Sequence, residues 1–389
     1  PEGLTPQYPP GTAILGGWFM FVLGMKGMMV VNTLAAIATL FATHSLSRRL
    51  FNDAPAIIAV ALLALCTFWV EYAYAYWPHT ISVLLVTLSL LLFLPALDAE
   101  KPWPPAFWAG LVIGASLLIR LDGLLILPFF VLASILFAQK PVAVLVGGAI
   151  GLLPGLLALA ALNAQKFGIF HPLTYGHAHG GGTALKGYAA PLALLAVAFG
   201  AMIWLRLRGL PRPTVLLGAA VLLAFVAVLV PAVGAILLKF VRGIDHILID
   251  IHGIPDNREG VVRFDDRTTL FWGLPKKALA QSLPWLGVLA ALMVVPWGRH
   301  RRNIVLVLLF FALWSLPFVL RSWHGGLGSN MRYLLPTVPA LCALAGWLIF
   351  ALQQRASQPG RLVGIGVVAG LALAFLWPAV ARSGQAGVH

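Results

Sequence analysis

Long apolar stretches recur along almost the whole chain, separated by short polar segments. Crossing a hydrocarbon layer about 30 Å thick takes about 20 residues of helix, and most of the stretches approach that length. The first one is short and rich in glycine, so we expect an interfacial or re-entrant helix there and about twelve crossings in the rest. The stretches occupy residues 12–25, 28–46, 54–70, 78–97, 106–120, 122–138, 141–163, 189–205, 214–238, 283–297, 303–320, 333–350 and 362–378.

The composition excludes a soluble globular protein. Apolar residues make up 60% of the chain, charged residues make up 10%, and the mean hydropathy is +0.93, whereas a soluble domain carries about 25% charged residues. Strands of outer-membrane barrels alternate in polarity and do not produce long apolar stretches. We therefore predict an all-α, polytopic transmembrane bundle that forms a single domain over residues 1–389. Because no Met and no signal peptide precede the first stretch, we also expect the natural N-terminus to lie upstream of Pro1.

Basic residues mark one side of the membrane. The net charge is +14, but its carriers lie in short loops between apolar stretches, which is the positive-inside pattern and not a nucleic-acid-binding surface. Outward segments are then expected at 71–77, 121, 164–188, 239–282 and 321–332, and residues 1–27 hold the end of an earlier outward loop with the interfacial helix. We predict a multi-pass protein of a bacterial inner membrane. The basic residues concerned are Arg48, Arg49, Lys140, Arg206, Arg208, Arg212, Arg299, Arg301, Arg302, Arg355 and Arg361.

The segment from Glu71 to His79 combines a carboxylate, a histidine and several aromatic residues, including Tyr74. Aromatic faces suit sugar rings, and the charged ends suit hydroxyl groups or a phosphate. The alternative is an aromatic belt at the membrane surface with polar side chains that reach toward water.

Arg120 and Asp122 lie between two apolar stretches, where an ionisable side chain is usually functional or paired. Residues two apart do not face each other in a helix, and both stretches are short. We therefore expect two half-helices that meet inside the membrane, with Arg120 facing an anion such as a lipid phosphate. A structural charge with a partner elsewhere in the bundle is the alternative.

Two outward loops contain candidate metal ligands or charged surfaces. His177 and His179 have a spacing that suits a metal in an extended segment, although zinc needs three or four ligands; solvated histidines in a glycine-rich loop are the alternative. The acidic 239–282 loop raises the same question, with a solvated surface as the alternative to a binding site. The residues leave the cofactor open, with a divalent metal as the candidate.

Residues 322–339 combine a glycine-rich loop with His324, Arg332 and Tyr333. Glycines let backbone amides approach a ligand closely, and amide hydrogens at the following helix start, together with the forked guanidinium of Arg332, favour an anion. The segment predicts an anion site at the outer face, with a simple helix start as the alternative.

The segment Tyr8-Pro9-Pro10-Gly11 leads into the first apolar stretch. Two successive prolines restrict the backbone and remove two amide donors, and proline biases the preceding residue toward an extended conformation. An ordinary helix start is one reading. A rigid, extended segment beside a membrane-embedded cavity is the other.

Several of these motifs, taken in order, resemble the GT-C membrane glycosyltransferases, and in particular the protein O-mannosyltransferase and aminoarabinose-transferase type. The resemblance rests on Tyr8-Pro-Pro-Gly11, on the segment from Val31-Asn-Thr-Leu34 to Ser47-Arg-Arg-Leu-Phe51, and on Arg332-Tyr-Leu-Leu-Pro336 with Pro339. The spacing of the apolar stretches extends it from residue 8 to about residue 350.

The resemblance implies transfer of a sugar from a polyprenyl-phosphate carrier to a lipid, glycan or protein acceptor at the outer face, with membrane lipids as surroundings and no nucleic acid as partner. It further implies a catalytic acidic residue in the first outward loop, upstream of Pro9-Pro10. Only Glu2 stands there, so we expect the principal carboxylate before Pro1, with Glu2 as a stand-in. By the same resemblance, we expect Tyr8, Pro9 and Pro10 to form the end of a substrate-binding loop. We expect Arg332 and Arg120 to bind the carrier phosphate.

Two other functions fit a dozen membrane spans. A transporter or flippase for an anionic lipid or glycolipid would also have intramembrane arginines and broken helices, but it should show internal pseudo-symmetry, and none is visible in the sequence. A non-catalytic relative of the glycosyltransferases would explain the missing acidic residue.

Overall fold

The computed structural model describes residues 9–173, 231–254, 260–263, 269–271, 273–323 and 329–356. These residues form two compact units. The first contains the described residues up to 42 and those from 72 to 173; the second contains residues 43–71 and the described residues from 231 onward. Helix α2 (Lys26–Phe51) belongs to both units, because it runs through residues 42 and 43 without a break.

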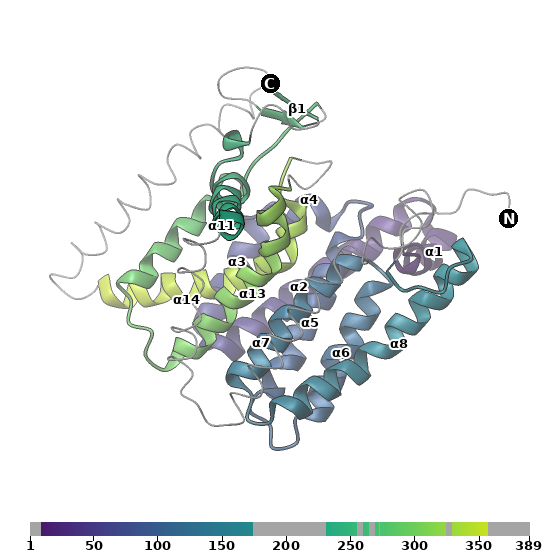
Figure 1. Ribbon diagram of the computed structural model, residues 1–389, viewed down its shortest axis with the longest axis horizontal. Coiled ribbons are helices and arrows are strands. Elements are labelled where there is room, and N and C mark those ends of the chain that lie inside the picture. Colours follow the sequence, from purple (N-terminus) through teal and green to yellow (C-terminus); the bar gives the residue numbers. More distant parts are fainter. Residues whose placement is uncertain are drawn as a thin grey trace. The chain divides into compact units, whose positions relative to one another are not determined.

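Helices make up the first unit (Figure 1). Besides the first part of α2, it contains α1 (Gly11–Leu23), the end of α4 (Trp69–Ala73), α5 (His79–Ala96), α6 (Trp103–Leu117), the 3₁₀ helix η1 (Leu121–Ile126), α7 (Leu127–Phe137) and α8 (Pro141–Phe167).

The second unit is also mainly helical and adds one small sheet in which β1 pairs with β2, and β2 with β3, all antiparallel. Its helices are α3 (Asp53–Leu65), α11 (Pro231–Ile244), the π-helical turn η3 (Asp245–Ile249), η4 (Ile251–Gly253), α12 (Leu279–Ser282), η5 (Pro284–Met293), η6 (Gly298–His300), α13 (Arg301–Arg321), η7 (Arg332–Thr337) and α14 (Val338–Ala356). Its strands are β1 (Val261–Arg263), β2 (Thr269–Phe271) and β3 (Leu274–Pro275).

The apolar helices confirm the predicted helical membrane protein. Five helical segments of the described part are long and apolar enough to cross a membrane, and these are Lys26–Phe51, His79–Ala96, Pro141–Phe167, Gly298–Arg321 and Arg332–Arg355. The expected number of about twelve crossings is not confirmed, because the other described apolar helices are shorter. The expected stretches at 189–205 and 362–378 lie outside the described residues.

Several helix ends differ from the expected boundaries. The stretch expected at 54–70 ends as a helix at Leu65, where the Thr67 hydroxyl donates to the Leu63 carbonyl and accepts from the Trp69 amide, so that α4 starts anew. Helix α8 continues to Phe167, into the expected 164–188 loop. Helical structure likewise reaches Ile249 within the expected 239–282 loop, followed by the small sheet.

The break expected between the two short stretches at Arg120 is present, and it is capped by the start of α1. Helix α6 ends at Leu117 and η1 begins at Leu121. The Gly11 amide donates to the Leu118 carbonyl at 2.7 Å, so an unpaired donor at one helix start meets an unpaired acceptor at another helix end. A Cβ on Gly11 would lie 2.5 Å from that carbonyl oxygen, so only glycine fits.

Pro10 corrects the extended reading of the Tyr8–Gly11 segment at its described end. Its backbone angles (φ −81°, ψ −7°) are helical, and it is the residue that precedes the first turn of α1. The Pro10 carbonyl accepts from the Ile14 amide at 2.9 Å. At Pro10 the segment is therefore an ordinary helix start.

Glycines hold α6 against α8, which run side by side (Figure 1). A Cβ on Gly155 would lie 2.3 Å from the backbone of Gly114, and one on Gly151 would lie 2.0 Å from the Phe107 carbonyl oxygen. Small residues four apart are the usual means by which helices approach closely in a membrane.

Replacing one of these glycines tests the packing. Gly151→Ala should lower the free energy of unfolding by about 1–3 kcal/mol, because the added methyl group overlaps the backbone of α6. Gly148→Ala is the matched control on the same helix, since its Cβ would lie 3.8 Å from the nearest atom. Thermal unfolding of the full chain in detergent measures both, and equal midpoints would contradict the account.

Candidate functional site

Arg120 and Asp122 form an ion pair at the break after α6. Arg120 has an extended backbone (φ −154°, ψ 135°), while Asp122 lies in the first turn of η1. The Arg120 Nε donates to both carboxylate oxygens of Asp122 at 3.0 Å, and its Nη2 lies 2.9 Å from Oδ2. Residues two apart cannot pair in one helix, and they do so here because the helix is broken.

His79, the first residue of α5, completes this group, which we call the Arg120 cluster (His79, Arg120 and Asp122). The Nη1 of Arg120 lies 3.0 Å from the Nε2 of His79. Since a guanidinium only donates, Nε2 accepts, which places the proton of the neutral ring on Nδ1. The ring lies 5.1 Å from that of Tyr72, and His79 is buried. All three guanidinium nitrogens of Arg120 therefore have protein partners. Asp122 is the carboxylate partner, whereas the sequence predicted a lipid phosphate or a partner elsewhere in the bundle.

A second group, the Glu71 cluster (Glu71, Ser282 and Asn330), lies in the second unit. Glu71 is on α4 and is exposed, whereas Asn330 is buried. The Nδ2 of Asn330 donates to Oε1 of Glu71 at 2.9 Å and to Oε2 at 2.8 Å. The hydroxyl of Ser282, at the end of α12, donates to the Oδ1 of Asn330 at 2.8 Å. The cluster presents a carboxylate that is held from behind and open on its other side.

A tight turn links Asn330 to Arg332. The Arg332 amide donates to the Asn330 carbonyl at 2.8 Å, and Met331 between them has φ −74° and ψ 64°. These values describe an inverse γ-turn. Arg332 is the first residue of η7 and is only 7% exposed. Its guanidinium carbon Cζ lies 5.4 Å from the centre of the Tyr333 ring.

Lys276 is a second buried cation beside this turn. The Lys277 amide donates to the Ser329 carbonyl at 2.9 Å, which fixes the β3–α12 connection next to the turn. Lys276 is 4% exposed. Burial, reinforced by the positive charge of Arg332, lowers the pKa of Lys276 from 10.5 to about 8. Two buried cations at one place form a site suited to an anion.

Sequence reasoning missed Asn330, Ser282 and Lys276, and it also missed a network around Asp250. The Oδ1 of Asp250 accepts from Nδ1 of His252 at 2.8 Å and from Nε2 of Gln281 at 2.9 Å. The sequence counted Asp250 only as part of an acidic loop. The short Asp-x-His spacing was a signal for this pair, but its link to Gln281 spans 31 residues and had none.

The other predicted site residues have different outcomes. Tyr74 is exposed, and Pro9 and Pro10 are half-buried at the start of α1. The described residues hold no group of three or more metal-ligating side chains. Glu2, Tyr8, His177, His179 and His324 lie outside the described residues.

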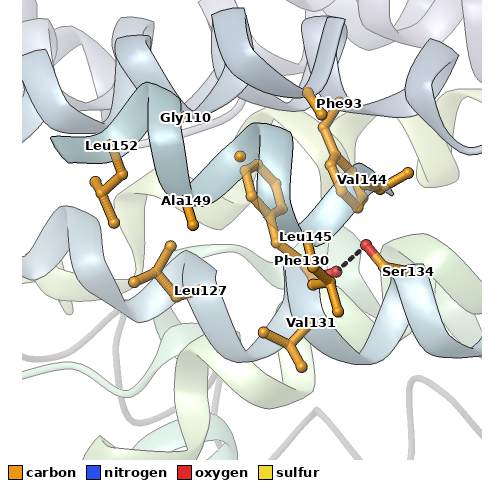
Figure 2. A pocket seen from close by; sticks show the side chains of 12 residues that line it. Phe93, Gly110, Leu127, Phe130, Val131, Ser134, Val144, Leu145, Ala149 and Leu152 are labelled. Atoms are coloured by element: carbon orange, nitrogen blue, oxygen red, sulfur yellow. Dashed lines mark hydrogen bonds between the residues drawn. The ribbon is translucent and has the colours of Figure 1, made fainter. Parts of the chain in front are cut away.

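An apolar cavity of about 190 Å³ lies in the first unit among α5, α6, α7 and α8 (Figure 2). Phe93, Phe130 and Leu127 are among its lining side chains, and its one polar side chain, Ser134, donates to the Phe130 carbonyl. The cavity suits hydrocarbon, and none of its lining residues belongs to the polar clusters.

Part of the chain matches a known family. Residues 8–166 match the model of the dolichyl-phosphate-mannose-protein mannosyltransferases. No curated protein sequence matches the chain significantly.

Solved structures of one archaeal enzyme share the fold. The oligosaccharyltransferase AglB of Archaeoglobus fulgidus, in complex with an inhibitory peptide and a dolichol-phosphate, aligns with 99% of this chain at 15% identity and a TM-score of 0.53. The apo form of the Archaeoglobus fulgidus oligosaccharyltransferase aligns with 100% of the chain at 16% identity and a TM-score of 0.52. This chain spans about half of their length, 48% in each case.

Burial of Lys276 predicts an unusual dependence of stability on pH. The folded protein releases this proton near pH 8 and the unfolded chain near 10.5, so the unfolded state binds more protons between these values and stability rises with pH across that window. The expected gain is on the order of 3 kcal/mol relative to a Lys276→Met variant, which lacks the titrating group. Thermal unfolding of both proteins from pH 7 to 11 measures it. Parallel curves for the two proteins would contradict the burial of a charged Lys276.

Proposed function

We propose that this chain is a membrane glycosyltransferase of the GT-C type, which the match over residues 8–166 and the shared fold support. It would transfer a sugar from a polyprenyl-phosphate carrier to a lipid, glycan or protein acceptor at the outer face of a bacterial inner membrane. The observation that carries the proposal is the buried pair of cations, Arg332 and Lys276, beside the carboxylate-holding Asn330. The family match and the fold favour a transferase over a lipid transporter or a non-catalytic relative.

The reaction explains why cations are needed. An acceptor hydroxyl oxygen attacks the anomeric carbon, the bond from that carbon to the phosphate oxygen breaks, and the phosphate leaves with the electron pair. The hydroxyl proton passes to a base. Negative charge grows on the departing phosphate, so positive groups that are already in place stabilise the transition state. Arg332 supplies a forked donor for two phosphate oxygens, and Lys276 adds a second charge.

We assign the carrier phosphate to Arg332, because it is buried next to a second cation, Lys276, and we assign a structural role to Arg120. The Nε, Nη1 and Nη2 of Arg120 already contact Asp122 and His79, which suits a structural role at the helix break. Arg332 lies at the start of η7, two residues after the amide that holds Glu71.

Glu71 is our candidate for binding the sugar. An exposed carboxylate held by a buried amide accepts hydrogen bonds from hydroxyl groups without first having to become ordered. The base that takes the proton of the acceptor hydroxyl is, by the resemblance, an acidic residue before Pro9. In this chain Glu2 is the acidic residue at that place. A divalent metal stays a candidate cofactor.

Removing the guanidinium tests the proposal. Arg332→Ala should lower the release of decaprenyl phosphate from radiolabelled decaprenyl-phosphate-mannose on the order of a hundredfold or more, because a preorganised cation at the leaving group is lost. The full chain reconstituted in liposomes with a mixed acceptor extract is the test system. Arg299→Ala, at an exposed arginine before α13, is the matched control.

Turnover that is unchanged in the Arg332→Ala protein would refute the role of this residue. Thermal unfolding of the same preparation shows whether the variant is folded, and we expect its midpoint to stay close to that of the unsubstituted chain.

A further inference from the structure

Asn330 connects two groups that the proposed function treats separately. Its side-chain amide holds Glu71, and its main-chain carbonyl accepts from the amide of Arg332 across the inverse γ-turn. The three residues 330–332 therefore carry the support for a carboxylate and the cation assigned to the phosphate on one short, hydrogen-bonded turn.

The orientation of the Asn330 amide follows from its neighbours. If its oxygen faced Glu71, it would lie 2.8–2.9 Å from two carboxylate oxygens, with no hydrogen between them. With the nitrogen toward Glu71, the oxygen faces Ser282 and accepts from its hydroxyl at 2.8 Å. Glu71 thus fixes which way the amide points, and Asn330 is 6% exposed. The single hydrogen of the Ser282 hydroxyl has two acceptors, the Asn330 Oδ1 at 2.8 Å and the Ala278 carbonyl at 3.1 Å, so Ser282 gives the weaker support.

The geometry leaves a defined part of the Glu71 carboxylate unused. An ionised carboxylate has about four lone-pair directions, and Asn330 occupies one on each oxygen. The remaining one on each oxygen belongs to an exposed side chain whose described hydrogen bonds all go to Asn330. These two remaining lone pairs point away from each other, so each of them can accept from a separate sugar hydroxyl group.

We propose that Asn330 is a positioning residue, supported by Ser282, which orients the Glu71 carboxylate to accept a hydrogen bond from a sugar hydroxyl group. The inference rests on the proposed function and deepens it. Arg332 binds the phosphate of the carrier, Glu71 binds the sugar attached to it, and the 330–332 turn sets the spacing between the two. Recognition of the sugar thus depends on a residue that does not touch it.

Two lipids separate the sugar contact from the phosphate contact. The affinity of the full chain in lipid nanodiscs is measured for decaprenyl phosphate and for decaprenyl-phosphate-mannose. We expect Asn330→Ala and Glu71→Ala each to weaken binding of the mannose-bearing lipid about tenfold, the effect of losing one charge-assisted hydrogen-bonding group. Both variants should bind bare decaprenyl phosphate within about twofold of the unsubstituted chain.

The double variant tests whether Asn330 acts through Glu71. In a protein that already carries Glu71→Ala, Asn330→Ala should not weaken binding of the mannose-bearing lipid further, because the carboxylate that Asn330 orients is absent. Asn330→Asp keeps the shape of the side chain but cannot donate when ionised, so it should behave like Asn330→Ala. Ser282→Ala leaves the amide in place and should give a smaller loss of a few-fold. Asn303→Ala removes an amide bond to the Leu50 carbonyl at the start of α13 and serves as the control.

The outcomes separate the two proposals. Equal weakening of both lipids by Asn330→Ala would show a purely structural residue, and additive losses in the double variant would show that it does not act through Glu71; either result overturns the inference. Equal affinity of the unsubstituted chain for the two lipids also overturns it, while leaving the phosphate site intact. Failure of the unsubstituted chain to bind bare decaprenyl phosphate would instead remove the proposed function.

Discussion

The need to pair every backbone amide and carbonyl inside an apolar surrounding governs this structure. Hydrocarbon offers no hydrogen bonds, so a helix can be interrupted only where the protein itself supplies partners. After α6, the Leu118 carbonyl receives the Gly11 amide. After α3, Thr67 bridges the end of one helix and the start of the next. Before η7, an inverse γ-turn closes on the Asn330 carbonyl. Each interruption allows a polar side chain to leave the helical pattern.

The polar clusters at these interruptions differ in what they leave available. In the Arg120 cluster, the guanidinium contacts both the carboxylate and the imidazole, and all three groups are largely buried. That arrangement stabilises a helix break. In the Glu71 cluster, a buried amide holds an exposed carboxylate, and a buried lysine with a lowered pKa lies beside Arg332. We therefore place substrate binding at the second cluster, although the sequence also proposed Arg120 and Asp122 for it.

Local sequence patterns predicted the structural features that residues close together in the chain determine. Apolar stretches identified the helices, and the charged Arg120-Leu-Asp122 step identified the break. For the Pro9-Pro10 step the sequence left open a helix start and an extended segment, and Pro10 starts a helix. The Gly11 amide also caps α6, a contact that joins residues far apart in the chain. Asn330 could not be found in this way, because its partner Glu71 is 259 residues away. The same holds for Lys276, whose importance comes from its burial beside Arg332.

Photocrosslinking tests the central claim, that the 330–332 turn and Lys276 bind the phosphate of a polyprenyl carrier, most directly. A decaprenyl phosphate with a diazirine on its first isoprene unit is irradiated with the full chain in nanodiscs, and the adducts are mapped by mass spectrometry. The account predicts adducts in peptides that contain Lys276 or residues 329–335, which excess decaprenyl phosphate removes and Arg332→Ala abolishes. Competed adducts confined to other segments, such as α8, would contradict it.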